Sequence, residues 1–82
     1  MKSVLLFESI HQVIRAEKVL KGRGMKIDLI PVPREISSDC GMAIELPLEV
    51  EGEVKRVLEE NRIPIRDRYS RDNGGAFQHR RP

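Results

Sequence analysis

Hydrophobic and polar positions along the chain form blocks that predict short strands separated by two helices. Residues 3–7 include an apolar run, which is typical of a strand buried on both faces. Ser9 follows this run and Gln12 comes three residues later, the spacing of a capping box at a helix start. Apolar residues then recur at helical spacing until two glycines interrupt them. The pattern therefore predicts a helix over residues 10–21.

The rest of the chain predicts three more strands and one more helix. A second strand is expected over residues 25–32, where two prolines end it because proline has no N–H to donate. A polar stretch then leads to a third strand over residues 42–46 and a second helix over residues 49–61. Residues 63–69 alternate between apolar and polar side chains, which predicts a fourth strand, and Pro64 makes it an edge strand.

The predicted order is strand-helix-strand-strand-helix-strand, which is the split βαβ or ferredoxin-like pattern of an α+β fold. Right-handed crossovers make the first and second strands parallel and place the third between them, antiparallel to both. We therefore expect an antiparallel four-stranded sheet with two helices on one face. At 82 residues the chain is long enough for one domain, which we assign to residues 1–69.

Charge distinguishes the C-terminal residues from the rest of the chain. There are 15 Lys and Arg against 13 Asp and Glu, a formal net charge of +2 at pH 7. Residues 1–69 hold 12 of each sign, so the excess lies in residues 70–82, with three arginines and one aspartate. We expect residues 70–82 to be a basic, flexible tail. The tail would leave the fourth strand at the sheet edge opposite the loop between strands two and three, and be dispensable for chemistry there.

Composition bounds the cellular setting. One cysteine cannot form an internal disulfide, which favours a reducing cytoplasm. With 39% hydrophobic and 34% charged residues, the chain is typical of a globular protein. No apolar run approaches the roughly 20 residues of a transmembrane helix, and the first residues lead into a strand without a signal-peptide pattern. We therefore expect a cytoplasmic protein with no membrane partner.

The single cysteine, Cys40, lies in the polar loop between the second and third predicted strands. In the predicted topology this loop shares one sheet edge with the end of the first strand and the start of the first helix, so Ser9 and His11 lie near it. A helix N-terminus, an imidazole and the guanidinium of Arg34 each lower the pKa of a nearby thiol and favour the nucleophilic thiolate. Cys40, His11 and Arg34 are therefore the candidate catalytic residues, and Ser9 supports them.

Four neighbouring residues bear on the reactivity of this thiol. The hydroxyls of Ser37 and Ser38 can donate hydrogen bonds, and Gly41 has no side chain to block the sulfur. Asp39 acts in the opposite direction, because an adjacent negative charge raises the pKa of a thiol. Structural roles remain open as well: a lone cysteine is often inert packing, and serines form turns. The imidazole and guanidinium can likewise be ordinary surface groups.

Residues 30–44 read Ile-Pro-Val-Pro-Arg-Glu-Ile-Ser-Ser-Asp-Cys-Gly-Met-Ala-Ile and closely resemble the signature of a small prokaryotic family of selenium/sulfur carrier-like proteins. The N-terminal segment is similar to that family at a further set of positions: Phe7, Ser9, His11, residues 16–18, residues 20–21 and Gly24. The resemblance covers about residues 3–66. It implies that Cys40 carries sulfur or selenium as a persulfide or perselenide.

The resemblance further implies a carrier that works with other proteins rather than a turnover enzyme. A persulfide or selenium donor such as a cysteine desulfurase would load Cys40, and an acceptor protein would receive the sulfur or selenium. No bound cofactor is expected. No metal site is expected either, because one cysteine and one nearby histidine are fewer than the ligands zinc requires. A homodimer is left open.

A second interpretation stays open: a ferredoxin-like module that binds nucleic acid or protein, or forms oligomers, and has no carrier chemistry. RNA-binding sheets of this kind stack bases on exposed aromatic residues. The chain has two Phe, one Tyr and no Trp, and the charge of residues 1–69 is balanced. The basic tail is then the main support for a nucleic-acid partner, which we do not expect.

Overall fold

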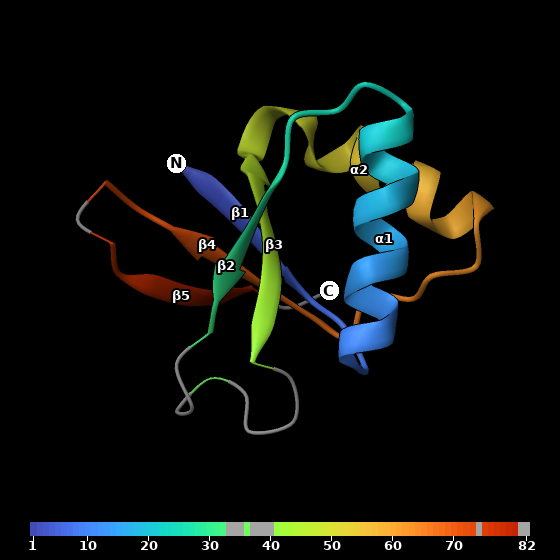
Figure 1. The fold of residues 1–82 in the computed structure, drawn as a ribbon. Coiled ribbons are helices and arrows are strands. Elements are labelled where there is room, and N and C mark those ends of the chain that lie inside the picture. Colours follow the sequence, from blue (N-terminus) through green and yellow to red (C-terminus); the bar gives the residue numbers. More distant parts are fainter. Residues whose placement is uncertain (33–35, 37–40, 74, 81–82) are drawn as a thin grey trace.

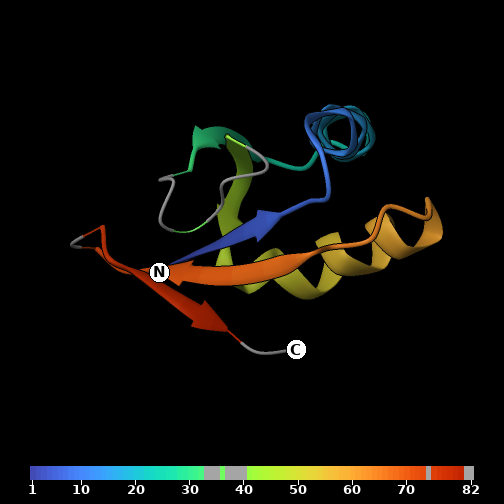
Figure 2. The same ribbon diagram turned by 90° about the horizontal axis from the view of Figure 1, so that it is seen from below.

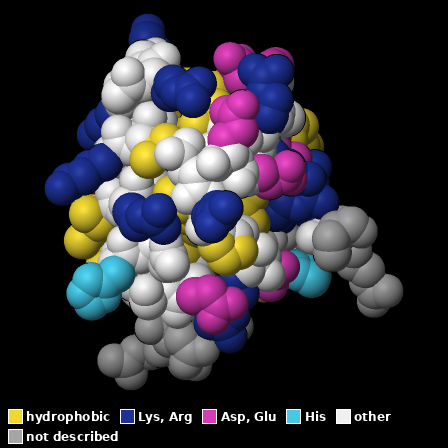
Figure 3. Space-filling view, turned by 90° about the vertical axis from the view of Figure 1, so that its right-hand side faces the viewer, with side chains coloured by type: hydrophobic (Ala, Val, Ile, Leu, Met, Phe, Trp, Pro, Cys, Tyr) yellow, Lys and Arg dark blue, Asp and Glu magenta, His cyan; other side chains and the backbone are white. Residues whose placement is uncertain are grey.

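The fold is described from a computed structural model, which covers residues 1–32, 36, 41–73 and 75–80. Its helices and strands follow the order β1 (Lys2–Leu6), α1 (Ile10–Gly22), β2 (Asp28–Pro31), β3 (Met42–Pro47), a 3-10 turn (Leu48–Val50), α2 (Glu51–Glu60), β4 (Asp67–Arg71) and β5 (Phe77–Arg80). Both helices lie on the same side of the sheet (Figure 1). On the face shown in Figure 3, Lys and Arg side chains are interspersed with Asp and Glu.

The sheet has five strands in the order β2-β3-β1-β4-β5, and each neighbouring pair is antiparallel. The sequence predicted four strands, so that prediction is wrong by one strand, β5, which comes from the segment 70–82. The prediction of an edge strand at Pro64 is also wrong. Strand β4 begins later, at Asp67, and has β1 on one side and β5 on the other.

Strand β1 is buried on both faces because it lies in the middle of the sheet. Leu5 of β1, and Phe7 just after the strand, belong to the core between the sheet and the two helices, where they pack with residues of both helices. Val4 and Leu6 point to the opposite face and pack with Ala43 and other apolar residues. The apolar run over residues 3–7 therefore has the two-sided burial that the sequence predicts.

Helix α1 ends in a Schellman motif built around a glycine. The N–H of Met25 donates to the carbonyl of Leu20 at 3.1 Å, and the N–H of Gly24 donates to the carbonyl of Lys21 at 3.0 Å. Gly24 has φ +75°, the left-handed conformation that this motif requires and that glycine adopts without strain. The helix therefore ends close to where the sequence predicts.

Helix α2 ends in the same motif, with arginine in place of glycine. The N–H of Ile63 donates to the carbonyl of Leu58 at 2.9 Å, and the N–H of Arg62 donates to that of Glu59 at 3.1 Å. Arg62 has φ +58°, a conformation that costs a residue with a Cβ about 1 kcal/mol. Ile63 is buried because it closes this cap and not because it lies in a strand, which is why the predicted strand over residues 63–69 begins too early.

One buried carboxylate, that of Glu51 at the start of α2, joins four elements of the fold. Ser3 of β1 donates its hydroxyl hydrogen to it. Arg68 of β4 donates from Nη1 to Oε1 at 2.9 Å. Arg80 of β5 binds it through both terminal nitrogens, Nη1 to Oε2 at 2.5 Å and Nη2 to Oε1 at 2.9 Å. We call these four residues the Glu51 network.

The Glu51 network keeps its carboxylate ionised. Burial by itself raises the pKa of Glu51, but the hydrogen bonds from Ser3 and Arg80 and the charges of Arg80 and Arg68 together lower it by more. The pKa in the folded chain is thus below the ordinary value of 4.5. The network therefore adds stability above the unfolded-state pKa, and this contribution is lost as the pH falls through the folded-state pKa.

We predict that Glu51→Gln lowers the free energy of unfolding by about 1–3 kcal/mol at neutral pH, because hydrogen bonds to a charged group are lost. The difference from the unsubstituted chain should shrink as the pH is lowered below 4.5. Urea unfolding at neutral and acidic pH measures both effects. Glu53→Gln, an exposed acid in the same helix turn, is the matched control. A difference that does not change with pH would contradict the prediction.

We predict that Arg62→Gly raises the free energy of unfolding by about 0.5–1 kcal/mol, because glycine adopts the left-handed cap conformation without strain. Gly24→Ala should have the opposite sign, since it places a Cβ at φ +75° in the equivalent cap of α1. Thermal unfolding of the two variants measures both changes. A lower melting temperature for Arg62→Gly would show that its side chain contributes more than the backbone strain costs.

Candidate functional site

The end of β1, the start of α1 and the start of β3 lie at the same edge of the sheet. Leu5 of β1 is opposite Ile44 of β3, so the end of β1 lies beside the start of β3. The N–H of Val32 donates to the carbonyl of Gly41 at 2.9 Å, which joins the two chain segments next to this edge. We call this region, with Leu6, Ser9, His11, Gly41 and Arg66, the site edge. Figure 2 views the molecule from this side, with α1 seen end-on.

The N-terminus of α1 opens onto the site edge. Ser9 is its N-cap in an extended conformation, and its hydroxyl oxygen accepts a hydrogen bond from the Gln12 N–H at 3.4 Å. The capping box predicted from the sequence therefore has its N-cap bond. The first turn of α1 contains no acidic residue, so no carboxylate of that turn offsets the positive end of the helix dipole. His11 lies exposed in the same turn.

The structure brings three of the predicted site residues to this edge. Ser9 and His11 come from the start of α1, and Gly41 is exposed just before β3. A Cβ added to Gly41 would meet no described atom within 4 Å, so its backbone is open to approach. The other predicted site residues lie outside the described residues, and their roles stay predictions: Arg34, Ser37, Ser38, Asp39 and Cys40.

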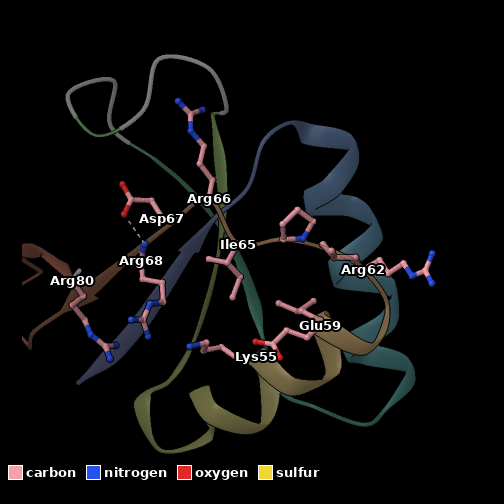
Figure 4. Close-up of a pocket in the computed structure, with 11 residues that line it drawn as sticks. Lys55, Glu59, Arg62, Ile65, Arg66, Asp67, Arg68 and Arg80 are labelled. Carbon is pink, nitrogen blue, oxygen red and sulfur yellow. Dashed lines mark hydrogen bonds between the residues drawn. The ribbon is translucent and has the colours of Figure 1, made fainter. Parts of the chain in front are cut away.

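Arg66 is a residue of this edge that the sequence analysis did not single out. Its N–H donates to the carbonyl of Leu6 at 2.8 Å, which fixes it beside the end of β1. The side chain is exposed and extends away from Lys55 and Glu59 (Figure 4). From the sequence, Arg66 was one of several polar residues in an alternating segment. Its position became clear only from the contact with β1, which no local pattern encodes.

The part of the chain that the structure describes offers neither a metal site nor a membrane-spanning helix. Within it, no three His, Cys, Asp or Glu side chains gather so that they could hold a metal ion. No described helix is long and apolar enough to cross a membrane. Every fully buried side-chain nitrogen or oxygen among the described residues has a hydrogen-bond partner.

Comparison with known proteins places the chain in a family. Residues 2–70 match the model of a family described as "Putative Se/S carrier protein-like". The chain belongs to this family. The match to the Se/S carrier protein-like family includes β1 to β3, both helices and most of β4, but β5 lies beyond it. The matched residues 2–70 include the site edge and, in the sequence, Cys40.

A curated relative extends the comparison but adds no activity. The chain is 40% identical over 62 residues to "Uncharacterized protein MJ0011" of Methanocaldococcus jannaschii. The aligned part is 76% of this chain and 31% of the relative, so the chain spans about a third of that protein's length. No solved structure matches the chain.

Proposed function

We propose that the chain is a carrier of sulfane sulfur or selenium, which it holds on Cys40 as a persulfide or perselenide and passes between partner proteins. Membership of the Se/S carrier protein-like family supports the carrier role in general terms. The chemistry on Cys40 is our inference from the sequence signature and from the surroundings of the site edge.

The observation that carries this proposal is the position of Gly41, the residue bonded to Cys40. Gly41 is exposed at the edge where the N-terminus of α1 and His11 also lie. The positive end of a helix dipole favours an anion, and a protonated imidazole does the same. A thiolate near this edge is therefore stabilised, and a thiolate is the form that attacks a sulfane sulfur.

The loading step is a thiol exchange that needs no external oxidant or reductant. The Cys40 thiolate attacks the terminal sulfur of a donor persulfide, and a new S–S bond forms on Cys40. The S–S bond of the donor breaks, and the donor leaves as a thiolate. Attack by an acceptor thiolate on the terminal sulfur of Cys40 reverses the exchange and releases the Cys40 thiolate. Selenium in place of the terminal sulfur follows the same steps.

The neighbouring residues have distinct roles in this proposal. His11 and Arg34 hold the anionic thiolate or persulfide by charge, and Ser37 and Ser38 donate hydrogen bonds to it. Asp39 acts in the opposite direction, because its negative charge disfavours the Cys40 thiolate that attacks in loading and leaves in release. Gly41, next to Cys40 in the chain, has no side chain that could block the sulfur.

The proposed partners follow from the chemistry. A cysteine desulfurase or another persulfide or selenium donor loads Cys40, and an acceptor protein with a thiolate of its own unloads it. The chain spans about a third of its curated relative. We therefore propose these partners for the present chain and not for that longer protein. We propose that transfer takes place in the cytoplasm, where the donor thiols stay reduced.

We predict that incubation with a cysteine desulfurase and cysteine adds the mass of one sulfur atom to the intact chain. The chain has one cysteine, so Cys40→Ser should abolish the adduct completely. Dithiothreitol should remove it, because a thiol reduces a persulfide. Intact-mass spectrometry under non-reducing conditions measures all three results, and a mixture without desulfurase is the control.

Two outcomes would argue against this proposal. A chain that never gains a sulfur atom, although the desulfurase is active on cysteine, does not accept sulfane sulfur from that donor class. An adduct that persists in Cys40→Ser would place the sulfur on another group.

Replacing cysteine with selenocysteine in the same assay separates a selenium carrier from a sulfur carrier.

A further inference from the structure

Strand β5 lies at one end of the sheet and pairs with β4 alone (Figure 2). None of the four residues described for β5 is fully buried. Its one apolar residue, Phe77, is half-buried against the apolar cluster on the sheet face away from the helices, and the guanidinium of Arg71 lies 5.4 Å from its ring centre. Burial of apolar surface, which holds β1 in place, therefore contributes little to the attachment of β5.

Contacts to two carboxylates hold β5 on both faces of the sheet. On the helix side, Arg80 binds Glu51 through both terminal nitrogens. On the opposite face, His79 Nε2 lies 2.5 Å from Asp67 Oδ1, and the ring centres of His79 and Tyr69 are 5.0 Å apart. Adjacent residues of a strand point to opposite faces, so one contact lies on each side of the sheet. We call the Arg80–Glu51 and His79–Asp67 contacts the β5 latch.

The rest of the fold has its main contacts without β5. The core between the sheet and the helices is built from β1, β3, the two helices and the segments next to them, and no residue described for β5 belongs to it. Without Arg80, Glu51 keeps the hydrogen bonds from Ser3 and Arg68, so α2 stays joined to β1 and β4. The residues that match the family, 2–70, also end before β5. Separation of β5 therefore breaks the latch and the pairing with β4, but leaves this core in place.

We propose that β5 is a latched strand, which opens from β4 while β1 to β4 and both helices stay folded. In the closed state, β5 covers the outer edge of β4. In the open state, the backbone N–H and C=O groups along that edge become accessible to another strand. The two contacts of the latch thus set how often the edge of β4 is exposed.

Amide hydrogen exchange of the full chain, followed by NMR at increasing low urea concentrations, tests this opening. The N–H of Asp72 donates to the carbonyl of Ala76 across the turn, so the alternate residue Gln78 also faces β4. We expect the Gln78 amide to exchange at least about 100-fold faster than that of Leu5 in β1. Urea should hardly affect the Gln78 amide and strongly accelerate exchange at Leu5, because opening of one strand exposes little surface.

A substitution in the latch tests its role in the opening. Arg80→Gln removes the two charge-assisted hydrogen bonds to Glu51, so it should accelerate exchange at Gln78 about tenfold. Arg56→Gln makes the same change at an exposed position of α2 outside the latch and should leave exchange at Gln78 unchanged.

Two results would overturn the latched strand. Exchange at Gln78 that rises with urea as steeply as exchange at Leu5 would mean that β5 separates only when the whole chain unfolds. Equal effects of Arg80→Gln and Arg56→Gln would mean that the contact with Glu51 does not control the opening. Neither readout involves Cys40, so failure here leaves the carrier proposal untouched.

Discussion

The assembly of this fold depends on the hydrogen bonds that the buried carboxylate of Glu51 accepts. A buried charge without partners is costly, and a paired one requires each partner to be in position. Here the partners come from β1, β4 and β5, so one side chain of α2 aligns the helix with three strands. The fifth strand is held to the rest of the molecule by this contact as well as by its pairing with β4.

The central position of β1 connects the fold to the proposed chemistry. Because β1 is buried on both faces, its register with β3 and β4 is strongly specified. That register fixes where β1 ends, and the chain passes from there directly into α1. The exposed start of α1 and Gly41 are thus held at a common edge by core packing. A nucleophile next to that edge gains a positive environment without a deep pocket.

Local patterns in the sequence predict much of the fold. The helix predicted over residues 10–21 is found as Ile10–Gly22, since its apolar spacing, N-cap and glycine end all agree. The strand predicted over residues 42–46 is found as Met42–Pro47. The predicted topology also placed the end of β1, which leads to Ser9 and His11, beside the start of β3, which follows Gly41, and the strand pairing has this arrangement. The reactivity of Cys40, which lies outside the described residues, stays a prediction.

The sequence-based prediction and the structure differ where contacts between residues far apart in the chain decide the structure. Strand β5 has one apolar residue, Phe77, so no period-two apolar pattern marks it. It is held by pairing with β4, by the bond from Arg80 to Glu51, and by Arg71 over the ring of Phe77 at 5.4 Å. Ile63 was misassigned to a strand because its burial belongs to a helix cap.

The carrier role requires that the sulfur of Cys40 be a thiolate at neutral pH, and the rate of its alkylation across pH measures this directly. Cys40 is the one cysteine of the chain, so every alkylation event reports on it. We predict a midpoint well below about 8.5, the pKa of a free cysteine. His11→Gln should raise the midpoint, whereas the same change at His79 of β5 should not. A midpoint at or above about 8.5 that is insensitive to His11 would contradict the carrier role.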